Sequence, residues 1–176
     1  MEMQRKNCLV KISGDVLESG TLDWIATLNR DYFVVVCVGG GTQINEAFTK
    51  EGLPVGKFGP LGRETKTFRE RQLARDVLEQ NQAQIQDALA SRGVHVSVMI
   101  PVLDIGTVLC HVNGDQFVLT AYHGFDVIYV VTTKDRVAEK RKSFTPYEKI
   151  VVVGSPIPPR EKLEGTRTPK HGKENA

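Results

Sequence analysis

Two short apolar runs, each followed by glycine, constrain the fold more than any other feature of this sequence. Residues 7–13 read NCLVKIS before Gly14, and residues 32–38 read YFVVVCV before Gly39, Gly40 and Gly41. Continuous apolar runs rich in β-branched residues are typical of strands that are buried on both faces. We therefore expect two interior strands of a sheet, each leading into a glycine loop.

The segment between these runs predicts a helix, because Leu22, Ile25 and Leu28 recur at helical spacing. Parallel strands are joined through a crossover of this kind. Further strands are expected at residues 94–102, 125–132 and 149–153, and further helices directly after Gly41 and at residues 116–122. The sequence thus predicts an α/β fold, a three-layer sandwich with a mainly parallel sheet.

Residues 64–91 predict one long helix, since they contain neither proline nor glycine and end shortly before Gly93. A helix of this length must cover the sheet, project into a partner, or do both. We expect the chain to form a homo-oligomer. One hypothesis is a purely structural role, in which this helix pairs with its counterpart in a dimer and the glycine loops bind nothing.

The length and composition indicate one domain, which we place at residues 1–155 of the 176. Residues 156–176 are rich in proline, glycine and charged side chains, so we expect them to be a flexible tail. Residues 160–176 hold five Lys or Arg and three Asp or Glu, which accounts for the net charge of +2. The predicted domain is therefore neutral and gives no electrostatic argument for a nucleic-acid partner.

The apolar segments are too short for a membrane span, which needs roughly 18 uninterrupted apolar residues, so no membrane partner is expected. Cys8, Cys37 and Cys110 each lie within an apolar run, where a small hydrophobic side chain fits. This pattern favours buried thiols in a reducing compartment, and we expect a cytoplasmic protein.

Both glycine loops follow predicted parallel strands, and open α/β sheets bind ligands at the carboxyl ends of such strands. Glycines let backbone N–H groups approach an anion, and the helix after Gly41 would direct its N-terminal dipole to the same point. Lys11 has the reach to lie across a transferring phosphoryl group. We expect a site for phosphate or carboxylate groups. The alternative is that the glycines only form tight turns and that Lys11 is solvated.

Several other kinds of site lack support in the sequence. No Gly-Lys-Ser or Gly-Lys-Thr follows the glycines, and the spacing of the dinucleotide fingerprint is absent. Cys110 and His111 have no second pair of ligands at metal-binding spacing, so no metal site is expected. His95 and His123 have no recognisable nucleophile partner.

The stretch VKISGDVLESG, followed further along by VVVCVGGGTQINEAF, resembles the amino-acid kinase superfamily, which includes acetylglutamate, aspartate and uridylate kinases. GRETKTF and the long helix after it are similar to the family's Gly-Arg segment, and VNGDQFVLTAYHGFDVIYVVT is similar to its Asn-x-Asp segment. The resemblance covers residues 9–132 and implies an amino-acid kinase-like fold. It also implies a phosphotransferase that uses ATP and magnesium and acts on a small molecule with a carboxylate or phosphate acceptor, such as an amino acid derivative or a nucleoside monophosphate.

The resemblance assigns roles to particular residues. Lys11 would stabilise the transferred phosphoryl group, and Asp115 would hold Lys11 or a magnesium-bound phosphate in position. These two are the expected catalytic residues. Binding of phosphate and acceptor is expected from Ser13, Gly14, Gly39, Gly40, Gly41, Arg63 and Asn113. For Asn113 and Asp115 the alternative is a simple turn, since Asn-Gly-Asp is also a good turn sequence.

The sequence also departs from the family pattern. Asp15 stands where the family usually has serine, and its carboxylate would repel a nucleotide phosphate unless a metal bridges them. Family members also continue with a nucleotide-binding half that contains a second lysine, where this chain has its predicted tail. The basic residues between Lys134 and Lys142 could supply that charge, although such a cluster is more often a solvated surface. The alternative function is a non-catalytic module, derived from the kinase fold, that binds an anion or small molecule.

Overall fold

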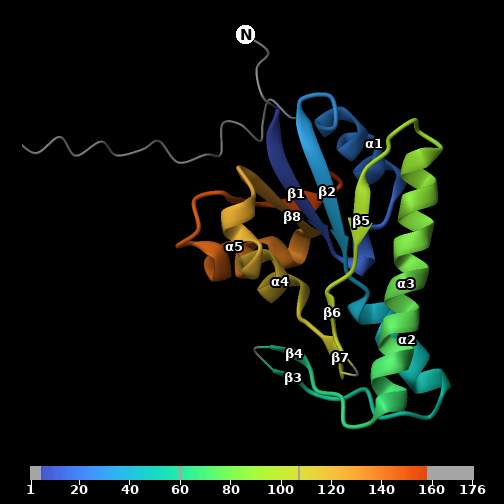
Figure 1. The fold of residues 1–176 in the computed structure, drawn as a ribbon. Coiled ribbons are helices and arrows are strands. Elements are labelled where there is room, and N and C mark those ends of the chain that lie inside the picture. The colour runs from blue at the N-terminus through green and yellow to red at the C-terminus, as the bar shows by residue number, and fades with distance from the viewer. Residues whose placement is uncertain (1–4, 60, 107, 158–176) are drawn as a thin grey trace, which may run out of the picture.

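Five parallel strands form the central sheet in the computed structural model, which describes residues 5–59, 61–106 and 108–157 (Figure 1). The strands lie in the order β5-β2-β1-β8-β9, and every neighbouring pair is parallel. The predicted α/β fold with a mainly parallel sheet is confirmed. The bounds are β1 Lys6–Ile12, β2 Tyr32–Val38, β5 Ser97–Met99, β8 Val127–Thr133 and β9 Ile150–Ser155.

Helices cover both faces of this sheet, which gives the three predicted layers. Cys8, Val10 and Ile12 of β1 belong to a core shared with α1 (Ser19–Leu28) and the second half of α3 (Phe68–Ala90). Leu9 belongs to a second core, shared with α4 (Gly114–Thr120) and α5 (Val137–Phe144). Because side chains alternate across a strand, Lys11 extends to the same side as Leu9, toward α4 and α5.

The helix α2 (Gly41–Lys50) begins directly after the second glycine loop, as predicted. Its inner face packs on the first half of α3 through a third apolar cluster of Ile44, Phe48, Ala74 and Leu78. This packing holds the first turn of α2 beside the carboxyl ends of β1 and β2.

Two small hairpins and three short 3-10 turns complete the fold. The hairpins pair β3 (Phe58–Gly59) with β4 (Gly62–Arg63), and β6 (Val102–Ile105) with β7 (Val108–His111). The turns are η1 (Gly14–Val16), η2 (Tyr122–Gly124) and η3 (Lys134–Arg136).

Two predicted elements differ from the observed ones by more than about two residues at an end, each for a local reason. The long helix begins at Phe68 instead of residue 64. Thr67 and Glu70 form a reciprocal capping box, which fixes the N-terminus of the helix at this point. The strand expected at 94–102 is divided into β5 and β6 around Pro101, which has no backbone N–H to donate to a ladder. The helix α5 was not predicted.

None of the helices in the described ranges is long and apolar enough to cross a membrane. Cys8 and Cys37 are buried, as expected, whereas Cys110 is only half-buried. Most of the predicted tail, residues 158–176, lies outside the described residues.

Candidate functional site

A cleft of about 530 Å³ lies at the carboxyl ends of β1 and β2. Its lining comes from the loops after these strands, the first residues of α2 and α4, both hairpins, and one side of α5. Every residue that the sequence assigned to the site lines this one cleft. They are Lys11, Ser13, Gly14, Gly39, Gly40, Gly41, Arg63, Asn113 and Asp115.

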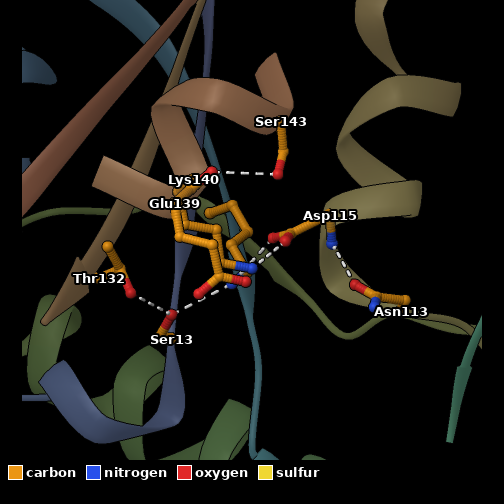
Figure 2. A network of polar contacts seen from close by, with 8 residues as sticks. Ser13, Asn113, Asp115, Thr132, Glu139, Lys140 and Ser143 are labelled. Atoms are coloured by element: carbon orange, nitrogen blue, oxygen red, sulfur yellow. Dashed lines mark hydrogen bonds and ion pairs between the residues drawn. The ribbon is translucent and has the colours of Figure 1, made fainter. Parts of the chain in front are cut away.

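Three charged side chains from β1, α4 and α5 meet inside the cleft. Lys11 Nζ lies 3.4 Å from Asp115 Oδ1, and Lys140 Nζ donates to Asp115 Oδ2 (Figure 2). The side chains of Lys11, Asp115 and Lys140 are 8%, 17% and 13% exposed, so all three are largely shielded from water. Lys11 Nζ also donates to Ser13 Oγ at 3.2 Å, and this hydroxyl lies 3.5 Å from Thr132 Oγ1. One carboxylate therefore bridges two ammonium groups, leaving a net positive charge.

The environment shifts the pKa values of this group in a consistent way. Burial lowers the pKa of Lys11, because desolvation disfavours the ammonium; Asp115 opposes this shift and Lys140 adds to it. Burial alone would raise the pKa of Asp115, but the charge of Lys11 and the hydrogen bond from Lys140 outweigh it and hold this pKa below its usual range. Asp115 is thus ionised, and its charge favours the protonated form of Lys11.

The Asn-Gly-Asp segment starts the helix α4 and makes room for the lysine. Asn113 is the N-cap, and its side-chain oxygen accepts a hydrogen bond of 2.8 Å from the backbone N–H of Asp115. A Cβ atom at Gly114 would lie only 2.9 Å from Lys11 Cε. Glycine at this position therefore lets Lys11 pass close to the helix start and reach Asp115.

The two glycine loops touch each other and are fixed by two side-chain amides. Gln43 Nε2 donates to the Gly14 carbonyl at 2.8 Å, and Asn81 Nδ2 donates to the Gly39 carbonyl at 3.1 Å. A Cβ atom at Gly14 would lie 2.9 Å from Gly40 Cα, so a larger residue there would push the loops apart. Both loops are held rigidly with the cleft on one side.

The N-terminus of α2 is open toward the cleft. Its N-cap is Gly40, which offers no side-chain acceptor, and Gly41 and Thr42 line the cleft. The first N–H groups of a helix have no intrahelical acceptor, and the helix dipole makes this end positive. This end of the cleft is suited to an anion, and Lys11 lines the same cleft.

Arg63 is buried, and its terminal nitrogens are hydrogen-bonded, whereas its Nε has no hydrogen-bond partner among the described residues. It is 5% exposed and lies over the rings of Phe58 and Phe48, at 4.4 and 5.3 Å from their centroids. Its terminal nitrogens donate to the carbonyls of Val55 and Gly41 (3.2 Å for the latter) and to Asn45 Oδ1. Burial lowers its pKa. In this arrangement Arg63 joins the β3–β4 hairpin to α2, and its expected contact with an acceptor stays a prediction.

Sequence reasoning did not assign Lys140 or His111 to the site. Lys140 was only one member of a basic cluster, yet it shares a helix face with Val137 and Phe144 at spacings of three and four, which places it inward. His111 was examined only as a metal ligand. Burial and the charge of Arg63 lower its pKa to about 4, so the imidazole in the cleft is neutral near pH 7.

Two comparisons with known proteins give no family assignment. No protein-family model matches the chain, and no curated protein is significantly similar to it. The resemblance to amino-acid kinases therefore stays a prediction from the motifs.

Proposed function

We propose that the chain is a phosphotransferase that passes the γ-phosphoryl group of ATP, bound with magnesium, to a carboxylate or phosphate acceptor. The observation that supports this function is the meeting of Lys11, Asp115 and Lys140 with the open N-terminus of α2 in one cleft. In the reaction, the bond between the γ-phosphorus and the β–γ bridging oxygen breaks. A bond from that phosphorus to an acceptor oxygen forms, and ADP leaves.

In this reaction Lys11 stabilises the negative charge on the oxygens of the transferring group. A largely desolvated ammonium acts more strongly than one in water, because the local dielectric is lower. The charge of Asp115 favours the ammonium form of Lys11, and Ser13 limits its orientation through the hydrogen bond of 3.2 Å. The N–H groups at the start of α2 and in the glycine loops bind the remaining phosphate oxygens.

The residues of the cleft fit magnesium only as an ion that arrives with a nucleotide. Within the described ranges, no three His, Cys, Asp or Glu side chains lie close enough together to hold a metal. Magnesium usually keeps several waters and is held by substrate phosphates with one or two carboxylates. Asp15 and Glu139 line the cleft and would supply these carboxylates. With magnesium held there, Asp15 would no longer repel a nucleotide phosphate.

A second candidate is a binding module without catalysis. This candidate is favoured because the cationic side chains of the cleft are already bonded to the protein. Arg63 donates to three protein acceptors, and Lys11 is paired with Asp115 and Ser13. A site in which the cations are held by the protein can bind an anion through backbone N–H groups alone.

The test is Lys11→Ala, with Lys6→Ala as the matched control. Lys6 begins the same strand but is exposed and outside the cleft. We expect Lys11→Ala to lower ADP release from ATP and magnesium, measured over a panel of amino acid carboxylates and nucleoside monophosphates, by at least about 100-fold. Lys6→Ala should match the wild type. Undiminished turnover in Lys11→Ala contradicts the phosphotransferase.

Calorimetry separates the two candidates when turnover is absent. Binding of inorganic phosphate by the wild type, without any turnover, identifies the binding module. If millimolar ATP with magnesium gives neither heat nor a shift in the unfolding temperature, the phosphotransferase is wrong.

A further inference from the structure

One face of the paired strands β6 and β7 is apolar. Directly opposed residues of an antiparallel pair point to the same side, and the register pairs Leu103 with Cys110 and Ile105 with Val108. These four side chains therefore share one face, which we call the hairpin surface. Leu103, Ile105 and Val108 are 45%, 62% and 55% exposed, and Cys110 is half-buried.

The opposite face of the hairpin is the one that contacts the rest of the chain. Leu109 is 7% exposed, and His111 lines the cleft. Asp104 forms an ion pair of 3.5 Å with Arg75 of α3. The hairpin surface must therefore turn outward. An outward face of an antiparallel sheet is normally polar, so this composition requires a further explanation.

Neighbouring elements extend the apolar exposure at this end of the molecule. Phe58 and Leu61, in the β3–β4 hairpin, are 59% and 78% exposed, and Phe68, the first residue of α3, is 63% exposed. The Leu61 carbonyl accepts a hydrogen bond of 3.1 Å from the Asn113 N–H, just after the end of β7. Figure 1 shows both hairpins at the same end as the start of α3. Among the described residues, the remaining large hydrophobic side chain with such exposure is Phe33, on β2.

We propose that a second copy of this chain docks on the hairpin surface and forms a two-fold symmetric dimer. A two-fold interface places the same patch of both copies face to face, so a charge near the symmetry axis would meet its own like. The hairpin surface contains no charged residue. The centres of homodimer interfaces are also more apolar than those of transient complexes.

The exposed area points to the same conclusion. The three exposed side chains of the hairpin surface, with Leu61 and Phe68, present several hundred Å² of apolar area. Apolar exposure of this extent is often functional and marks an interaction surface. A stable interface buries about 800 Å² per partner, so this end of the molecule supplies most of an apolar interface core.

This dimer differs from the one expected through the long helix. The apolar stripe of α3 already packs inside the molecule, since Ala74, Leu78, Ile85 and Leu89 are at most 3% exposed. The helix therefore has no comparable apolar face left for a partner. The dimer through the hairpin surface does not depend on the proposed phosphotransferase activity.

The test measures the mass of the full chain in solution by light scattering and by sedimentation, over a range of concentrations. We expect a dimer that Ile105→Glu and Val108→Lys each convert to monomer, with a dissociation constant raised at least about 100-fold, because each buries a charge in an apolar contact. Phe33→Glu is the matched control, since it puts a charge on an exposed aromatic residue (54%) outside this surface. It should leave the dimer intact.

Hydrogen exchange of the wild type gives a measurement that needs no variant. Amides of residues 102–111 should gain protection as concentration rises, whereas those of the second half of α3, residues 80–90, should not. A wild type that stays monomeric overturns the proposal, even if it binds another molecule. So does a dimer whose mass is unchanged in Ile105→Glu and Val108→Lys, or one that protects α3 instead of the hairpin.

Discussion

Asp115 carries the negative charge that offsets the two lysine ammonium groups of the cleft. It is the carboxylate between Lys11 and Lys140, and it is 17% exposed. Ser13 gives Lys11 a second hydrogen-bond acceptor, but a hydroxyl does not neutralise a charge. Without the carboxylate, two shielded ammonium groups would face each other with their repulsion uncompensated.

Replacing Asp115 by asparagine should therefore destabilise the fold. We expect Asp115→Asn to lower the free energy of unfolding at pH 7 by about 3 kcal/mol, as when one partner of a buried pair is removed. Urea unfolding measures this difference. The control is Asp87→Asn, at an exposed position of α3, which should change stability by less than about 0.5 kcal/mol. Equal effects of the two substitutions would contradict this role of Asp115.

The same substitution has a pH dependence with a definite sign. The pKa of Asp115 is lowered in the folded state, so its stabilising contribution is present above the unfolded pKa of about 3.9. The contribution is lost as the pH falls through the folded pKa. The stability difference between wild type and Asp115→Asn should thus be constant from neutral pH to about pH 5 and shrink below about pH 4. A difference that does not shrink on acidification would exclude an ionised Asp115 as its source.

At the scale of single elements, the long helix α3 owes its start to two residues. Thr67 Oγ1 accepts a hydrogen bond of 3.2 Å from the Glu70 N–H, and Glu70 Oε2 accepts one of 3.2 Å from the Thr67 N–H. This box satisfies groups that would otherwise lack partners at a helix end. It also fixes where the chain leaves the β3–β4 hairpin, which carries Arg63.

We expect Thr67→Ala to lower the free energy of unfolding by about 1 kcal/mol, the usual cost of losing an N-cap. Thermal or urea unfolding measures this change. Thr49→Ala is the control, because Thr49 Oγ1 bonds only to the Asn45 carbonyl within an exposed part of α2. It should change stability by less than about 0.5 kcal/mol. A Thr67→Ala chain as stable as this control would mean that packing alone sets the start of α3.

The elements differ in how far the sequence could predict them. β1 and β2 were predictable, because their apolar runs and glycines are local signals. The contact between Lys11 and Asp115 was expected only through the family resemblance, since the two residues lie far apart in the chain. The bonds that hold Arg63 were not predictable, because its acceptors in Val55 and Asn45 are brought together only by the fold.

Lys140 and the hairpin surface show a different limit of the sequence. A lysine in a basic run and an isoleucine in a strand have ordinary interpretations, as a solvated residue and a core residue. Here Lys140 points inward to Asp115, while Ile105 is 62% exposed. Which side of an element faces the core depends on the neighbouring elements, and a short helix or strand gives too few residues to show it.

At the scale of the whole molecule, the sheet separates two apolar cores, and each core contains one buried cysteine. Cys8 lies in the core beneath α1 and α3, and Cys37 lies in the core beneath α4 and α5; both are 0% exposed. Burial raises the pKa of Cys37 to about 12; the charge of Lys11 opposes this shift and that of Asp115 adds to it. Since the thiolate is the reactive form, Cys37 is protected by its pKa as well as by its position.

Thiol labelling should therefore show whether the two cores open together. In dilute native protein at pH 8, we expect one thiol per chain, Cys110, to react promptly with a disulfide reagent. The other two should react slowly and at one common rate, because both become accessible only when the whole sheet unfolds. Cys110→Ser is the control and should remove the prompt phase alone. Two distinct slow rates would mean that the layer of α4 and α5 opens independently of the layer of α1 and α3, and three prompt thiols would contradict the burial of both cores.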